Sequence, residues 1–185
     1  TSGRVAPGFA HFVNLSAQFL SRREQVQALL QQAAAYSVET NMVDAKVKPL
    51  VLEITERQLI GDFDDLMRDL QPLVDFGFRL ALDDFGSGYS SFLYLAKLPI
   101  SFLKIEGWMV KNIRGNPRVL AMVQSIIRLA RDQGIVTIAE FVEDAATADL
   151  LAELGADWGQ GWYFGKPQCD VEAVQALKTA RTGTG

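Results

Sequence analysis

The stretch "LALDDFGSGYSS" (residues 80–91) carries an apolar run that ends in two adjacent aspartates, and a turn rich in glycine and serine follows them. A short apolar run bounded by a turn is typical of a buried strand. The stretch therefore predicts a strand that leads through an acidic turn toward a helix. Two interpretations of Asp83 and Asp84 stay open at this point. They belong to a solvated turn, or they bind a ligand.

The rest of the chain repeats this pattern of a short β-rich run followed by a longer helical one. We predict strands over 11–16, 50–55, 79–85, 101–106, 135–142 and 158–164. Helical patterns lie around 21–36, 62–76, 116–133, 145–154 and 170–181. The polar stretch 37–49 predicts a surface loop. Gly77, Gly134 and Gly155 stand where helices are expected to end.

Repeated strand–helix units indicate parallel strands joined by right-handed crossovers, in an open doubly wound sheet or a (β/α)8 barrel. A barrel needs eight units and usually about 250 residues. This chain has 185 residues, with six predicted strands. We therefore expect a single α/β domain over 1–185, either an open sheet or a barrel that is incomplete at its N-terminus.

Composition narrows the classes of function. With 49% hydrophobic residues the chain can bury a substantial core, and a net charge of -4 argues against a surface that tracks a nucleic-acid polymer. No apolar run is long enough to predict a membrane contact. The only cysteine suits a cytoplasmic location, and the only histidine excludes zinc sites rich in histidine. Carboxylates, amides and lysine must then carry any chemistry.

Alternation along each predicted strand separates an aliphatic face from a face with one polar residue near the carboxyl end. In 50–54, Leu52 and Ile54 define the face toward the helices, which leaves Glu53 on the other side. One polar residue in each of the other strands lies on the corresponding side: Asn14, Asp83, Lys104, Glu140 and Gln160. A single such residue is usually a helix cap or solvated. Six strand ends together predict a shared site, because barrel strands converge on one catalytic face.

The chemistry of this predicted set favours a hard cation. Clustered carboxylates raise one another's pKa unless a positive charge neutralises them. Carboxylate and amide oxygens suit Mg²⁺ or Mn²⁺ and not zinc. Two such ions are the usual apparatus for in-line attack of water on a phosphodiester. Lys104 is the one cation of the set, and it suits holding the attacking water or stabilising charge on the phosphoryl oxygens.

The ordered motifs of the chain resemble those of the EAL-domain phosphodiesterases, bacterial enzymes that hydrolyse cyclic di-GMP to linear pGpG with two divalent metals. The resemblance rests on six motifs: "VNLS" (13–16), "LEITE" (52–56), "DDFGSGYSS" (83–91), "LKIE" (103–106), "AEFVE" (139–143) and "QGWYFGKP" (160–167). It covers nearly the whole chain. It implies a TIM-like (β/α)8 barrel of the EAL type that lacks its first strand and helix.

The resemblance also implies roles for individual residues. Ligands of two divalent cations, Mg²⁺ or Mn²⁺, are expected at Asn14, Glu53, Asp83, Asp84 and Glu140. Catalytic roles are expected for Lys104, which positions the nucleophilic water, for Glu140, which orients it, and for Glu56. The last of these is expected to anchor the loop after the aspartate pair, with simple helix capping as the alternative. Substrate contacts are expected from Asp84, Ser87, Glu143 and Gln160.

Several positions depart from the family's pattern. Glu106 stands where Asp is usual, Ser87 where Thr is frequent, and Phe141 where Gly is common. The Glu-Ala-Leu motif that names the family is absent from the chain, together with the arginine that follows it. The chain as given therefore lacks one metal ligand and one phosphate contact that the resemblance implies.

The resemblance predicts a metal-dependent, cyclic-guanylate-specific phosphodiesterase of bacterial second-messenger signalling and biofilm control. The alternative is an inactive cyclic di-GMP receptor or a regulatory, dimerising EAL domain. Expected partners are cyclic di-GMP, a second copy in a homodimer, and an upstream sensory or GGDEF domain. The expected location is the cytoplasm, including the case of a cytoplasmic part of a membrane-anchored protein.

Overall fold

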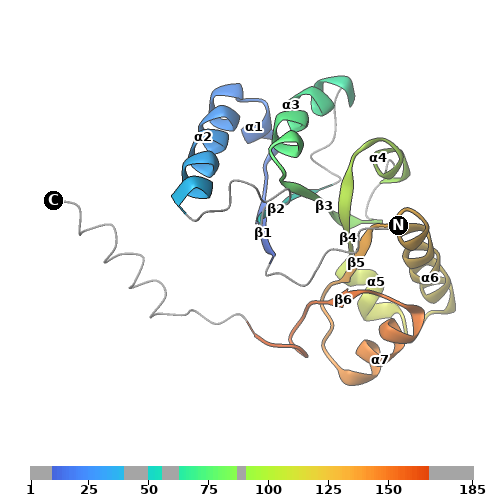
Figure 1. Ribbon diagram of the computed structural model, residues 1–185. Coiled ribbons are helices and arrows are strands. Elements are labelled where there is room, and N and C mark those ends of the chain that lie inside the picture. Colours follow the sequence, from blue (N-terminus) through green and yellow to red (C-terminus); the bar gives the residue numbers. More distant parts are fainter. Residues whose placement is uncertain (1–9, 40–49, 56–62, 87–90, 167–185) are drawn as a thin grey trace.

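The computed structural model describes residues 10–39, 50–55, 63–86 and 91–166. Its strands are β1 (His11–Asn14), β2 (Leu50–Thr55), β3 (Arg79–Phe85), β4 (Ile100–Ile105), β5 (Val136–Ala139) and β6 (Trp158–Gly159). They form one parallel sheet in the order β1-β2-β3-β4-β5-β6. This sequential order excludes the doubly wound alternative, in which the strand order reverses. The sheet curls into a partial TIM-like barrel (Figure 1).

The helices lie along the outside of the curved sheet (Figure 1). They are α1 (Ala17–Leu20), α2 (Arg23–Glu39), α3 (Phe63–Asp75), α4 (Ser91–Lys97), α5 (Gly107–Asn112), α6 (Pro117–Asp132) and α7 (Ala145–Leu154). Four predicted helices match α2, α3, α6 and α7. The structure adds α1, α4 and α5, and it extends α2 into the stretch predicted as a loop. The predicted helix at 170–181 lies outside the described residues.

The predicted alternation of strand faces is confirmed by two separate apolar clusters. Leu52, Ile54, Leu80 and Leu82 pack in the larger cluster between sheet and helices. The inner side of the curl holds a smaller cluster of Val51, Ala81, Phe102 and Ile138, with Phe12 packed against it.

Aromatic rings link the two edge strands across this interior. The ring centroid of Phe102 lies 5.3 Å from that of Phe12 on β1 and 5.3 Å from that of Trp158 on β6. Rings at such separations are in contact. Because β1 and β6 are the outermost strands of the sheet, these contacts require the sheet to curve around a common interior.

Four strand boundaries were predicted too long or shifted, and the backbone explains two of them. β5 ends at Ala139, and not at residue 142, because the chain turns sharply at Phe141, whose φ is 54°. β6 covers two residues, and not 158–164, because Gly161 packs against the backbone of Val142 so closely that a Cβ there would overlap it. The predicted strands 11–16 and 101–106 are observed as 11–14 and 100–105.

Local capping explains why α6 lies where the pattern predicts it. Asn116 accepts hydrogen bonds from the backbone N–H groups of Arg118 and Val119, at 3.0 and 3.4 Å, and Pro117 occupies the first helical position. Gly134 follows the helix with φ 73°.

Within the described ranges, no helix combines the length and the apolar character that crossing a membrane would require.

Candidate active site at the carboxyl ends of the strands

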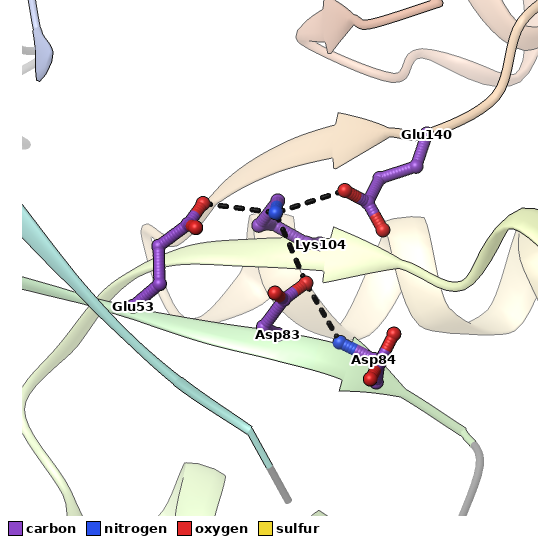
Figure 2. Close-up of polar contacts among 5 residues, drawn as sticks. All are labelled: Glu53, Asp83, Asp84, Lys104 and Glu140. Atoms are coloured by element: carbon purple, nitrogen blue, oxygen red, sulfur yellow. Dashed lines mark hydrogen bonds and ion pairs between the residues drawn. The ribbon is translucent and has the colours of Figure 1, made fainter. Parts of the chain in front are cut away.

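One lysine ammonium lies between three carboxylates at the carboxyl ends of four adjacent strands (Figure 2). The Nζ atom of Lys104 on β4 lies 2.8 Å from Glu53 Oε1, 3.0 Å from Asp83 Oδ1 and 2.8 Å from Glu140 Oε1. These partners stand on β2, on β3 and directly after β5. All four side chains are buried. We call this set of four residues the carboxylate centre.

The charges of the carboxylate centre do not balance, since one ammonium faces three carboxylates. Burial alone would lower the pKa of Lys104, but hydrogen bonds to Glu140 and Glu53 and the charge of Asp83 outweigh it and raise that pKa, so the ammonium stays protonated. Burial raises the pKa of Glu140, although its contact with Lys104 opposes the shift. The centre therefore favours additional positive charge.

Asp84 extends this centre outward. Its backbone N–H donates to Asp83 Oδ1 at 2.9 Å, which fixes the orientation of the Asp83 carboxylate. One oxygen each from Asp83, Asp84 and Glu140 lie within 4.8 Å of one another. Three carboxylate oxygens at this spacing suit a hard divalent cation, which prefers oxygen ligands. These three residues therefore fit a site for one hard divalent cation.

Two residues beside the centre have unusual backbone conformations. Among the described residues, Asp84 (φ 56°) and Phe141 (φ 54°) are the non-glycine residues with positive φ. Each directly follows a carboxylate of the centre, Asp83 or Glu140. Aspartate tolerates this conformation, whereas it is strained for phenylalanine. Such strain concentrates at functional sites, where surrounding contacts hold it in place.

The structure describes three other predicted site residues, and none of them belongs to the carboxylate centre. Asn14 ends β1, is exposed, and is paired in register with Glu53. Gln160 follows β6, where its backbone N–H donates to Ala139 O at 2.8 Å. Glu143 is exposed and forms an ion pair of 3.2 Å with Lys111. Glu56 and Ser87 lie outside the described residues.

A cavity of about 830 Å³ opens beside the centre and shares Glu140 with it. Its lining also includes Glu143 and Gln160, together with residues that the sequence pattern did not single out as a site: Lys111, Trp162, Phe164 and Lys166. We call it the aromatic pocket. The dense aromatic and glycine content of 158–165 is the signal in the sequence for such a pocket, although the pattern of 158–164 predicts a strand.

Comparison with known proteins relates this chain to one protein family. A family model described as "EAL domain" matches residues 3–167. The cyclic di-GMP phosphodiesterase PdeB of Shewanella oneidensis is 37% identical over 156 residues, which are 84% of this chain and 17% of PdeB. The chain thus spans less than a fifth of that relative.

Two solved structures extend the comparison. The PaMucR phosphodiesterase in complex with c-di-GMP superposes with a TM-score of 0.76 at 31% identity, over 89% of this chain and 64% of that chain. The manganese/cy-diGMP complex of Klebsiella pneumoniae BlrP1 gives a TM-score of 0.73 at 28% identity, over 85% and 39%. Both alignments include most of the partial barrel described above.

Proposed function

The chain belongs to the EAL domain family, and on that premise we propose that it acts as a metal-dependent phosphodiesterase that hydrolyses cyclic di-GMP to linear pGpG. The observation that carries the proposal is the carboxylate centre, in which Lys104 contacts Glu53, Asp83 and Glu140 at 2.8–3.0 Å. In barrels of this type, catalytic residues stand at the carboxyl ends of the strands. PdeB, the relative described above, is named a cyclic di-GMP phosphodiesterase.

The metal ligands in this proposal are the oxygen donors around the centre: Asn14, Glu53, Asp83, Asp84 and Glu140. Their residue types suit two Mg²⁺ or Mn²⁺ ions. What the ions would supply is positive charge beside the attacked phosphoryl group and a lower pKa for water. The excess of carboxylates over ammonium groups supports binding of such charge here.

Residues of the chain itself would orient the attacking water and stabilise the charge that develops at phosphorus. The three N–H donors of Lys104 contact Glu53, Asp83 and Glu140, so Lys104 positions the attacking water through these carboxylates, or its fixed positive charge stabilises charge that develops on the phosphoryl oxygens. Glu140, which contacts the same ammonium, is proposed to orient the attacking water with one of its carboxylate oxygens. Hydrolysis adds the water oxygen to phosphorus, breaks one phosphate ester bond of the ring, and leaves a hydroxyl and a terminal phosphate.

Substrate contacts in this proposal come from Gln160 and Glu143, which line the aromatic pocket with Glu140, and from Asp84 and Ser87. The role proposed for Glu56 is to anchor the loop that follows Asp84. A cytoplasmic location and an upstream sensory or GGDEF domain complete the proposal. PdeB is far longer than this chain, which leaves room in such a relative for further domains.

The test is a hydrolysis assay of the natural-length protein with cyclic di-GMP and either Mn²⁺ or Mg²⁺. The products are separated by chromatography and identified by mass spectrometry. We expect pGpG, and we expect EDTA to abolish its formation. Tight binding of cyclic di-GMP without any product at long times would overturn the enzymatic proposal. That outcome would establish the receptor alternative instead.

We further propose that a second copy of the chain packs on an apolar groove between β3, α4, α5 and α6. The groove has a volume of about 580 Å³ and includes Phe85, Phe92, Met109 and Met122. Phe92 and Met122 are 67% and 47% exposed, which is unusual for large apolar side chains that line one groove. A homodimer would bury both.

Sedimentation velocity tests this dimer. We expect Phe92→Ser to weaken self-association at least tenfold, because a large apolar side chain contributes more than the 1.4 kcal/mol that this factor requires. Leu93→Ser is the matched control, since Leu93 is a 48% exposed neighbour on α4 that does not line the groove. Equal association of both variants and the wild type would contradict the proposed interface.

A further inference from the structure

Asp83 and Asp84 are neighbours on β3, yet oxygens of both carboxylates lie within 4.8 Å of each other and of Glu140. Successive residues of a regular strand point to opposite faces of the sheet. The register explains the exception, because β3 advances three residues from Leu82 to Phe85 while its partner β4 advances only two. The extra residue makes a β-bulge, and a bulge redirects a side chain. Asp84, with φ 56°, lies within this bulge.

The backbone beyond the bulge packs against one side chain of α5. Gly86 has φ 102°, and a Cβ there would overlap Cε of Met109. Met109 is 1% exposed, so the surrounding core fixes its methyl group against Gly86. Phe85, between Asp84 and Gly86, is buried as well. Because one residue separates Asp84 from Gly86, the position of Met109 constrains where the Asp84 carboxylate can lie.

A second turn, after β5, packs against the same helix. Phe141 follows Glu140 directly and has φ 54°, which is strained for phenylalanine. Its ring lies against Gly107 so closely that a Cβ on Gly107 would overlap Cδ2 of the ring. The backbone N–H of Glu140 donates to Ile105 O at 3.3 Å, two residues before α5 begins. The turn that carries Glu140 therefore rests on the start of α5.

The helix α5 lies between these two turns. It follows β4, whose neighbours in the sheet are β3 and β5, and the carboxylates of Asp84 and Glu140 lie at the ends of those neighbours (Figure 2). Gly107 and Met109 are two positions apart, which is about 200° around the axis of an α-helix. They therefore face nearly opposite directions, one toward each turn. The thickness of α5 sets the separation of the two turns.

We propose that α5 is a spacer that fixes the distance between the metal-binding carboxylates on the turns after β3 and β5. Met109 positions Asp84 on one side of the helix, and Gly107 positions Glu140 on the other. This inference rests on the proposed function for the presence of a divalent cation, which needs its oxygen ligands at a fixed spacing. Neither Met109 nor Gly107 lines the aromatic pocket, so both are positioning residues that act through the carboxylates.

Met109→Ala tests one side of the spacer in the natural-length protein. It removes the methyl group beside Gly86, so we expect the Kd for Mn²⁺ to rise about tenfold or more, as is usual when a residue that orients a metal ligand is lost. Calorimetric titration measures this Kd, and electron paramagnetic resonance of unbound Mn²⁺ checks it. Leu70→Ala is the matched control, because Leu70 is fully buried on α3, a helix that contributes no residue to the carboxylate centre. The metal-free melting temperature should fall in both variants, and only Met109→Ala should bind Mn²⁺ more weakly.

Gly107→Ala tests the other side of the spacer. Alanine favours the helical backbone more than glycine does, so α5 itself should not be weakened. The new Cβ displaces the Phe141 ring and with it the turn that carries Glu140, so we expect the Kd for Mn²⁺ to rise about tenfold. In the Phe141→Gly background the same substitution should change this Kd by less than about twofold, because no ring remains to displace. Glycine at position 141 adopts the left-handed conformation freely, so that background should fold.

The same titrations separate the spacer from the proposed function. If the wild type binds Mn²⁺ but forms no pGpG, weaker binding by both variants supports the spacer while the phosphodiesterase proposal fails. If the wild type binds no Mn²⁺, both fail. If the wild type binds Mn²⁺ and forms pGpG, a Kd within about twofold of wild type for Met109→Ala or Gly107→Ala overturns only the spacer. An equal rise in Kd on Gly107→Ala in both backgrounds overturns it as well.

Discussion

Replacement of Lys104 by methionine should slow hydrolysis severely and destabilise the metal-free protein. We expect kcat to fall on the order of 10²–10³-fold, the usual effect of removing one fixed donor to a charge-bearing transition state. Removing one partner from a buried ionic group costs about 3–5 kcal/mol. Since Lys104 is 5% exposed and contacts three carboxylates, we expect a loss of that order.

The destabilisation of Lys104→Met should depend on pH and on divalent cations. Burial already raises the pKa of Glu140, and the variant loses the hydrogen bond that opposes this shift. Between the unfolded and the folded pKa of Glu140, the folded state binds more protons than the unfolded chain. The free energy of unfolding of Lys104→Met therefore rises as pH falls through this range. The difference in that free energy between the variant and the wild type should shrink toward about pH 4. Added Mn²⁺ should also restore stability, but not activity.

Chemical denaturation of Lys104→Met from pH 4 to 8, with and without Mn²⁺, measures these effects. The matched control is Lys97→Met, since Lys97 is an exposed lysine at the last residue of α4 and does not belong to the carboxylate centre. The loss of unfolding free energy in Lys104→Met should change with pH and should be reduced by Mn²⁺. If it does neither, the carboxylate centre does not carry the surplus negative charge that we infer.

Replacement of Asp83 by asparagine should have the opposite effect on metal-free stability and an equally large effect on activity. The amide oxygen can still accept the hydrogen bond from the Asp84 backbone N–H, while one surplus negative charge disappears. We expect the metal-free melting temperature to be unchanged or higher. Hydrolysis should fall on the order of 10³-fold, because several kcal/mol of charge stabilisation at the phosphoryl group are lost.

Metal binding makes the Asp83→Asn prediction measurable without an activity assay. A cation at a hundredfold excess over its Kd stabilises the folded protein by about 2.7 kcal/mol, which is roughly 5–10 °C in Tm for a domain of this size. We expect Mn²⁺ to shift the wild type by this amount and Asp83→Asn by far less. Equal shifts for both proteins would show that Asp83 is not a ligand.

Much of the fold was predictable because strand alternation has a strict period of two. Leu52 and Glu53 are neighbours in sequence, and the structure places them on opposite faces, in the helix-facing cluster and in the carboxylate centre. The convergence of Glu53, Asp83, Lys104 and Glu140 follows from this period and from parallel strand order. Both are properties of short-range sequence patterns.

Features that depend on close approach were not predictable in the same way. α4 and α5 have seven and six residues, which is too short for a helical period to emerge. The close contact between the Phe141 ring and Gly107 joins residues that are 34 positions apart in the sequence. It depends on the strained φ of Phe141. No local pattern carries such a contact. The sequence does not predict the aromatic pocket, because the pattern of 158–164 indicates a strand and the approach of Phe141 to Gly107 leaves no local signal.

Hydrolysis of cyclic di-GMP in ¹⁸O-labelled water by the natural-length protein with Mn²⁺, side by side with Asp83→Asn, tests the proposed chemistry of the carboxylate centre. We expect the wild type to yield pGpG with one ¹⁸O atom in its terminal phosphate, and Asp83→Asn to yield almost none. Labelled product at equal rates from both proteins, or no product from the wild type while cyclic di-GMP stays bound, would contradict the proposed chemistry.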